Sequence, residues 1–125
     1  MSDIRANTIS DAAGTGPIDL YKQSAAKAWI NFNGTGTVAI RDSLNVASLT
    51  DNGVGIYRVA HSSALATSSY AVVTGVSRYD GIGAVSQELT PRSLTTTQYD
   101  VHAEYNNGSY VDFENCFAAI HGDLA

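Results

Sequence analysis

Residues 27–55 read KAWINFNGTGTVAIRDSLNVASLTDNGVG, in which two Asn-Gly pairs separate runs of β-type residues. The first run alternates apolar and polar side chains, and its apolar positions are Ala28, Ile30 and Phe32. Successive side chains of a strand point to opposite faces, so this alternation predicts a strand with one buried face. Asn and Gly tolerate the positive φ values of a tight hairpin, so Asn33-Gly34 and Asn52-Gly53 predict the turns on either side of a returning strand.

The alternation continues beyond residue 55. Further strand patterns occupy residues 55–62, 70–79, 97–107 and 109–122. In the first of them, Tyr57, Val59 and His61 share a face. The mixed segment 80–96 is predicted to turn at Asp80-Gly81, and Pro91 within it indicates an edge strand, because proline cannot donate to a strand ladder.

A third pair, Asn107-Gly108, predicts a hairpin between the last two strands. In that register Cys116 lies near Tyr99 and Val101 in the core, where a buried free thiol fills space. One face of the last strand is predicted to hold Val111, Phe113 and Phe117.

Together these signals predict an all-β fold, an antiparallel β-sandwich or small barrel of about six to eight strands, formed by residues 27–125. Residues 1–26 lack an apolar period long enough to fold alone, and their isolated aliphatic residues are Ile4, Ile9, Ile18 and Leu20. We interpret this segment as an extended attachment arm that takes its order from another surface. A loose terminus is the alternative interpretation.

Composition narrows the classes of partner. Charged residues are 15% of the 125 residues, against about 25% in an average soluble protein. Two interpretations fit: a monomer coated with Ser and Thr, or a β-fold whose surface lies largely against other copies, because interface cores are depleted in charge. The net charge is −5 and the seven Lys and Arg are scattered, which argues against nucleic acid as a partner.

No apolar run is long enough for membrane insertion, so none is predicted. The opening residues 1–5 lack the pattern of a signal peptide. We therefore expect synthesis in a cytoplasm. A later route out of the cell that needs no signal, such as release inside a virus particle, is compatible with this expectation.

No constellation of residues predicts catalysis. Ser62 and Ser63 follow His61, but adjacent side chains on a strand point apart, and no nucleophile-elbow pattern surrounds any serine. The three histidines lack a closely spaced His or Cys partner, so no metal ligand is predicted. The acids available for glycoside cleavage are Glu88, Asp100, Glu104, Asp112 and Glu114. Most of them are predicted to lie on solvent-exposed faces of strands. We predict no catalytic residue, no cofactor and no metal.

Exposed aromatic side chains are the remaining candidates for recognition. Trp29, Tyr79 and Tyr110 are predicted to serve a surface that contacts a host glycan or protein. Their rings pack while offering one polar tip, which suits an interface and a core edge alike. Core packing is therefore the alternative for each of them.

Two stretches carry a resemblance to known proteins: IRANTISDAAGTGPIDLYKQ, and AKAWINFNGTGTVAIRDSLNVASLTDNGVGIYRVAHSSAL followed by YAVVTGVSRY. They resemble a family of tail-fibre and virion structural proteins of tailed bacteriophages, many of them marine. The family's Lys-Ala-Trp-x-x-Phe-Asn-Gly core matches Lys27, Ala28, Trp29, Phe32, Asn33 and Gly34. Its Asn-Val-x-Ser-x-x-Asp-Asn-Gly turn matches Asn45, Val46, Ser48, Asp51, Asn52 and Gly53.

The resemblance implies a component of the virion, expected to be a homotrimer. Residues 1–26 would attach to capsid or tail proteins, and the β-domain would be displayed outward. The chain has no long shaft, so a small tail protein or a head spike fits better than a whole tail fibre. The family brings no catalytic residues with it. A carbohydrate-binding module for host glycans is the alternative function, and a glycan-degrading enzyme is the third.

Overall fold

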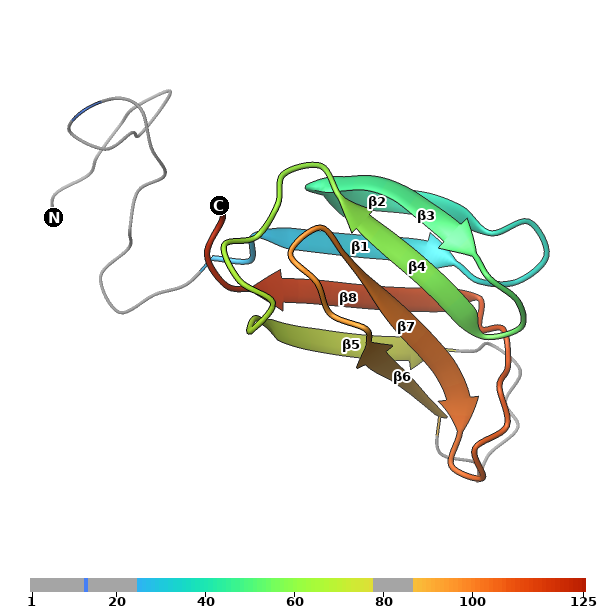
Figure 1. Cartoon of the computed structure of the whole chain (residues 1–125). Coiled ribbons are helices and arrows are strands. Elements are labelled where there is room, and N and C mark those ends of the chain that lie inside the picture. The colour runs from blue at the N-terminus through green and yellow to red at the C-terminus, as the bar shows by residue number, and fades with distance from the viewer. Residues whose placement is uncertain (1–12, 14–24, 78–86) are drawn as a thin grey trace, which may run out of the picture.

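The computed structural model describes residue 13 and residues 25–77 and 87–125, and it shows two four-stranded antiparallel sheets packed together (Figure 1). Sheet A has the order β2-β1-β8-β5, with β1 at Ala28–Asn33, β2 at Ala39–Leu44, β5 at Ala71–Ser77 and β8 at Asn115–His121. Sheet B has the order β3-β4-β7-β6, with β3 at Val46–Asp51, β4 at Ile56–His61, β6 at Gln87–Arg92 and β7 at Gln98–Tyr105. The all-β antiparallel prediction is confirmed.

Some predictions fall outside the described residues. They concern the apolar arm residues Ile4, Ile9, Ile18 and Leu20, together with Tyr79 and the turn at Asp80-Gly81. The prediction that Pro91 marks an edge strand is confirmed, because β6 is the last strand of sheet B.

The chain moves repeatedly between the two sheets. The hairpin β1–β2 lies in sheet A, the hairpins β3–β4 and β6–β7 lie in sheet B, and β5 and β8 return to sheet A. The last strand, β8, enters between β1 and β5 (Figure 1). At one lateral edge of the sandwich the chain passes directly from one sheet to the other, because Asn45 connects the edge strands β2 and β3. At the other edge the Thr74 hydroxyl of β5 donates a hydrogen bond to the Leu89 carbonyl of β6.

The core lies between the sheets and follows the predicted alternation. Sheet A contributes the buried side chains of Ala28, Ile30 and Phe32 from β1 and of Cys116, Ala118 and Ile120 from β8. Sheet B contributes Tyr57, Val59 and His61 from β4 and Tyr99, Val101 and Ala103 from β7. Phe32 and Tyr57 meet edge to face across the core, with ring centroids 5.0 Å apart.

The first Asn-Gly pair lies in a turn, as predicted, but Gly34 does not have the positive φ that was the reason for the prediction. Positive φ occurs at Gly36, where φ is 60°, and not at Gly34. Gly34 is buried, and a Cβ there would lie 2.6 Å from the Tyr57 hydroxyl and 2.7 Å from the Phe113 carbonyl. Asn33 organises the loop, because its Oδ1 accepts from the Thr35 amide at 3.2 Å. Glycine is needed at position 34 for close approach, while the asparagine side chain shapes the turn.

The run after this turn is two strands rather than one. Asn45 has φ of 55°, and at this residue the chain leaves sheet A and enters sheet B. The Asn45 side chain holds the corner by accepting from the Ser63 amide at 2.6 Å and donating to the Ser63 carbonyl at 3.1 Å. Left-handed backbone is tolerated by asparagine more than by most residues, so Asn45 was the available signal for this corner.

The predicted hairpin between the last two strands is wrong. The turn at Asn107-Gly108 forms, with Gly108 at φ of 80°, but pairing ends soon after the bridge between Glu104 and Tyr110. The chain then crosses to sheet A, where β8 pairs with β1 and β5. The crossing breaks the alternation, so Phe113 is buried whereas Phe117 points outward.

One cluster ties the loops of both sheets together at this end of the sandwich. The buried Tyr57 hydroxyl lies 2.7 Å from Oδ1 of Asp112 and 3.0 Å from the Gly34 carbonyl. The same Asp112 oxygen accepts from the Gly55 amide at 2.7 Å, and the Gly34 amide donates to the Phe113 carbonyl at 2.9 Å. Burial and the Asp112 carboxylate both raise the pKa of Tyr57, so its hydroxyl stays protonated as a donor.

Replacing Tyr57 with Phe tests this cluster. The variant keeps the ring in the core but removes a hydrogen bond to a carboxylate, so we expect the free energy of unfolding to fall by about 1.5–3 kcal/mol. Urea unfolding followed by circular dichroism measures the change. The control Tyr110→Phe alters an exposed tyrosine and should change stability by less than about 0.5 kcal/mol. Equal effects of the two substitutions would show that the cluster is not a major support.

His61 occupies an unusual place in the core. Its ring lies 5.5 Å from the Tyr99 ring and 6.1 Å from the Tyr70 ring, measured between centroids. Within the described residues neither ring nitrogen has a hydrogen-bond partner. Burial lowers the pKa of His61, and the nearby Asn45 backbone opposes this shift only in part. The fold therefore favours the neutral imidazole.

This burial predicts a loss of stability in mild acid. The unfolded chain takes up a proton on this histidine near pH 6.5, whereas the folded chain resists it to lower pH. The free energy of unfolding should therefore fall as the pH drops from 7 toward 5. In the His61→Phe variant this decline should be smaller. Denaturant unfolding across this range measures it, and a wild-type stability that is flat from pH 7 to 5 contradicts the prediction.

Candidate functional site

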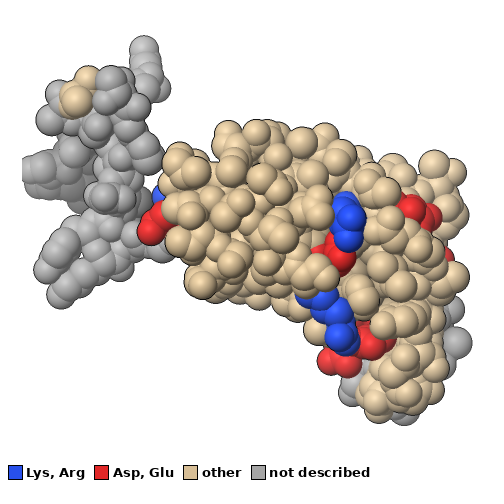
Figure 2. Space-filling model, in the orientation of Figure 1, with Lys and Arg blue, Asp and Glu red and all other residues tan. Residues whose placement is uncertain are grey.

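The two outward faces of the sandwich differ in chemistry, and together they are the candidate interaction surfaces. The outer face of sheet B carries charged and hydroxyl side chains from β4, β7 and β6. Figure 2 shows a short band of blue and red side chains across the middle of this side of the molecule, with further charged atoms near its left and right ends and uncharged surface between them. The band comes from register, since Arg58 and Arg92 both lie opposite Asp100 on neighbouring strands.

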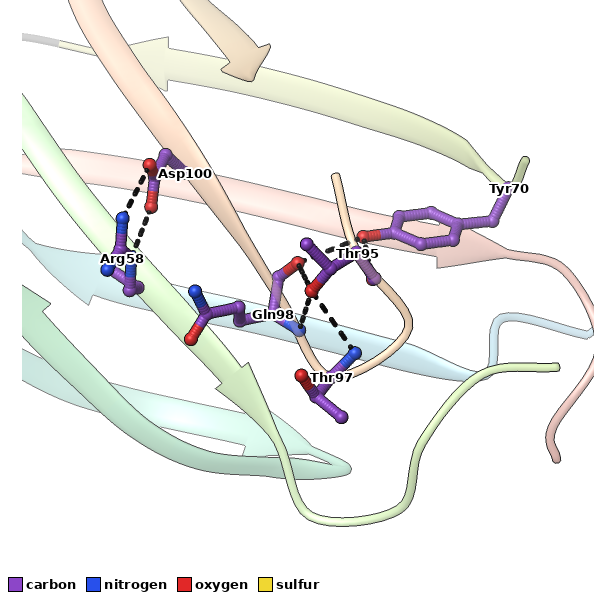
Figure 3. Close-up of polar contacts among 6 residues, drawn as sticks. All are labelled: Arg58, Tyr70, Thr95, Thr97, Gln98 and Asp100. Atoms are coloured by element: carbon purple, nitrogen blue, oxygen red, sulfur yellow. Dashed lines mark hydrogen bonds and ion pairs between the residues drawn. The ribbon is translucent and has the colours of Figure 1, made fainter. Parts of the chain in front are cut away.

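Arg58 and Asp100 form the strongest ion pair of this band. The Arg58 guanidinium donates to both carboxylate oxygens of Asp100, from Nε at 2.7 Å and from Nη2 at 3.0 Å (Figure 3). This pairing lowers the pKa of Asp100 and raises that of Arg58. Such a two-pronged pair fixes both side chains, so Asp100 is a paired acid rather than the freely solvated one predicted from sequence.

A second group lies further along β7. Oε1 of Glu104 accepts from the Thr90 hydroxyl at 3.1 Å and from Arg92 at 3.4 Å. Beside it, Nδ1 of His102 lies 3.3 Å from the Tyr110 hydroxyl, with the two rings edge to face at 5.4 Å. Glu104, Arg92, His102 and Tyr110 therefore form a polar strip at one end of sheet B, with a carboxylate, a guanidinium, an imidazole and a phenol.

The hairpin between β6 and β7 is fixed from sheet A. The Thr95 hydroxyl accepts from the Gln98 amide at 3.1 Å, and the Thr95 carbonyl accepts from the Tyr70 hydroxyl at 3.0 Å (Figure 3). Tyr70 stands just before β5 and reaches across the sandwich to this turn. This contact holds the start of β7 in place and therefore supports the position of Asp100 two residues later.

The outer face of sheet A carries a row of apolar side chains. Register places one row across all four strands, and it consists of Leu44, Trp29, Ala119 and Val73. In the next row Phe117 lies between Asn31 and Gly75, and Asp42 follows beyond Asn31 on the edge strand β2. A Cβ on Gly75 would be 2.2 Å from the Phe117 ring, so the ring covers the glycine and is held at the surface. Strands β1, β5 and β8 contain no Asp, Glu, Lys or Arg.

Three of these side chains are strongly exposed. Val73 is 61% exposed, Leu44 is 49% exposed and Phe117 is 45% exposed, while Trp29 between them is half-buried. Single exposed apolar residues are common, whereas a row of them across a whole sheet is a candidate interaction surface. The alternation in the sequence predicts that Trp29 points outward. Which residues of the neighbouring strands lie beside it follows only from the strand register.

The predicted recognition residues do not form one site. Trp29 lies on the outer face of sheet A, and Tyr110 lies with His102 at sheet B, on the other side of the sandwich. Tyr79 lies outside the described residues. Trp29 therefore belongs with the apolar row and Tyr110 with the polar strip.

The described residues show no gathered catalytic or metal-binding group. Cys116 is fully buried in the core, and burial raises the pKa of its thiol to about 12, so the sulfur is a packed thiol rather than a nucleophile. In the described part of the chain, no three His, Cys, Asp or Glu side chains are grouped so as to hold a metal ion. A membrane-crossing helix of sufficient length and apolarity is likewise not found among these residues.

No protein-family model, curated protein or solved structure matches this chain. The resemblance to bacteriophage virion proteins thus stays a prediction carried by the residues quoted for it. Of those residues, Lys27 to Gly34 now lie on β1 and the start of its turn, and Asp51 to Gly53 form the β3–β4 turn.

Proposed function

We propose that this chain is a structural component of a tailed-bacteriophage particle, assembled in the host cytoplasm and located in the virion. In this proposal the β-domain associates as a homotrimer and is displayed outward, and residues 1–26 attach it to capsid or tail proteins. It acts as a building block and not as an enzyme. A small tail protein and a head spike are both compatible with this role.

The observation that carries the proposal is the apolar row on sheet A. The chain has a net charge of −5, and the outer face of sheet B is charged and rich in hydroxyl groups. On the opposite side of the sandwich, Leu44, Val73 and Phe117 are exposed to solvent. Interface cores are depleted in charge and enriched in aromatic residues, which is the character of this face. A displayed, multimeric virion domain makes use of such a surface by covering it with other copies.

The arm gives the sharpest test of attachment. Its apolar residues precede β1 directly, and a contact with another virion protein would desolvate them. In a full chain with Ile9→Asp and Ile18→Asp, we expect the amount of protein in purified phage particles to fall at least about tenfold, because burying a charge weakens such a contact by more than 1.4 kcal/mol. Quantitative mass spectrometry relative to the major capsid protein measures this amount.

The control chain carries Thr8→Asp and Thr15→Asp, which add the same charge at polar positions of the same segment. It should be incorporated at the wild-type level. If the wild-type chain is absent from particles, the virion proposal fails. If the Ile9 and Ile18 variant is incorporated fully, the arm is not the attachment.

A second candidate function is binding of a host-surface glycan, and the polar strip on sheet B favours it. Tyr110 is 44% exposed and lies beside His102, Glu104 and Arg92, which combine an open ring with hydrogen-bond donors and acceptors. Sugars are bound by such a combination of a stacking ring and paired polar groups. This function is compatible with the first, because a displayed virion domain can carry a recognition site.

Tyr110→Ala separates the two functions. If the strip binds glycan, the variant should lose about fivefold in affinity for the bound glycan, since a ring contact contributes on the order of 1 kcal/mol. Tyr110→Phe keeps the ring and should retain most of the affinity. Binding to an array of bacterial surface polysaccharides measures both. Wild-type chain that binds no glycan on the array removes this candidate and leaves the structural role unaffected.

A further inference from the structure

We propose that the outer face of sheet A is a homotypic interface, covered by the same face of other copies of this chain. The inference rests on the multimeric part of the proposed function and names the surface and the partner. The surface consists of Leu44, Trp29, Ala119 and Val73 in one row and Phe117 over Gly75 in the next.

The face is complementary to itself in size. Its β2–β1 half carries two large side chains, Leu44 and Trp29, and its β8–β5 half pairs them in the same row with the smaller Ala119 and Val73. Around a symmetry axis parallel to the strands, the large side chains of this row in one copy meet the small side chains of the same row in the next. In the neighbouring row, Phe117 of one copy meets the smaller Asn31 of the next. The indole of Trp29 then lies over the low surface at Ala119 of the partner subunit. Interfaces need this alternation of large and small side chains to pack without voids.

Charge points to another copy as the occupant. Each copy carries a net charge of −5, so two copies repel except where neither presents acidic groups. Strands β1, β8 and β5 contain no acidic residue. The acid in the strands of sheet A is Asp42 on the edge strand β2, at the end of the row that holds Phe117, and Arg41 precedes it in the chain. A lipid surface is disfavoured, because membrane-binding faces are ringed by Lys and Arg, and the basic residue in the strands of this sheet is Arg41.

The face is also rigid enough to serve as an interface. It is built on β-strands, and Phe117 is held in place because its ring fills the space above Gly75. Arg41, at the bulge of β2, donates to the Phe32 carbonyl at 3.2 Å and to Oδ1 of Asn31 at 3.5 Å, so its guanidinium is held at the β2 edge of the face. A surface whose side chains are already ordered loses less conformational entropy when it is covered.

The test uses the full chain with Val73→Glu, and the matched control is Val54→Glu. Both valines are 61% exposed, but Val54 lies in the turn between β3 and β4, outside the apolar row. The two variants are therefore expected to fold equally well as single molecules. Sedimentation velocity over a concentration series measures self-association, and circular dichroism confirms folding. Leu44→Glu, on the opposite edge of the same face, is the second variant in case β5 does not accept the charge.

We expect the wild-type chain to sediment as an oligomer, with Val73→Glu and Leu44→Glu weakening self-association at least about tenfold while Val54→Glu does not change it. Trp29 is the single tryptophan, so its fluorescence reports on the face directly. Its emission should shift to longer wavelength when the two face variants dissociate, because the indole then meets water.

Other outcomes overturn the inference. A monomeric wild-type chain, or an oligomer that neither face variant weakens, would show that copies do not meet here. A monomer with Trp29 already shielded from quenchers would show that another segment of the same chain covers the face. A wild-type dimer that the face variants dissociate supports this interface and contradicts the homotrimer of the proposed function. Presence in phage particles is measured separately, so the two proposals can fail independently.

Discussion

The structure depends on one buried hydroxyl. Tyr57 stands in the middle of the core with its ring against Phe32, and its oxygen contacts both Asp112 and the Gly34 backbone. Through these contacts the β1–β2 loop, strand β4 and the crossing segment before β8 converge at one point. A buried polar group of this kind is stable only when its partners are in place, so the arrangement fixes where each loop lies and which sheet the last strand joins.

The two outer faces then divide the work of the molecule. On sheet B, acids that would otherwise lie open are paired with Arg58 and Arg92, so the polar face is ordered although it borders water. On sheet A, the strands present methyl and aromatic groups instead. The few charged residues of the chain are thus unevenly distributed between the two outer faces. Most charged side chains of the strands lie on sheet B, whereas those of sheet A are Arg41 and Asp42 on its edge strand β2.

Much of the fold could be predicted from the sequence, because strand alternation and turn residues are local signals. The inward faces of β1, β4 and β7 follow directly from Ala28 to Phe32, Tyr57 to His61 and Tyr99 to Ala103. Which sheet a strand joins is not a local property. The split at Asn45 and the crossing after Tyr110 depend on tertiary contacts. The hairpin between the last two strands is therefore predicted wrongly, and so is the shared face of Phe113 and Phe117. The row on sheet A was invisible for the same reason, since its members come from four separate strands.

The central position of β8 has a consequence for biosynthesis. Sheet A is completed only after β8 has been synthesised, because β8 must enter between β1 and β5. Until then the two halves of the apolar face are not joined, and the Leu44 and Trp29 hairpin has no neighbour to pack beside. A nascent chain therefore cannot present the finished surface to a neighbouring nascent chain. Chain connectivity alone therefore delays association through this face until β8 is in place.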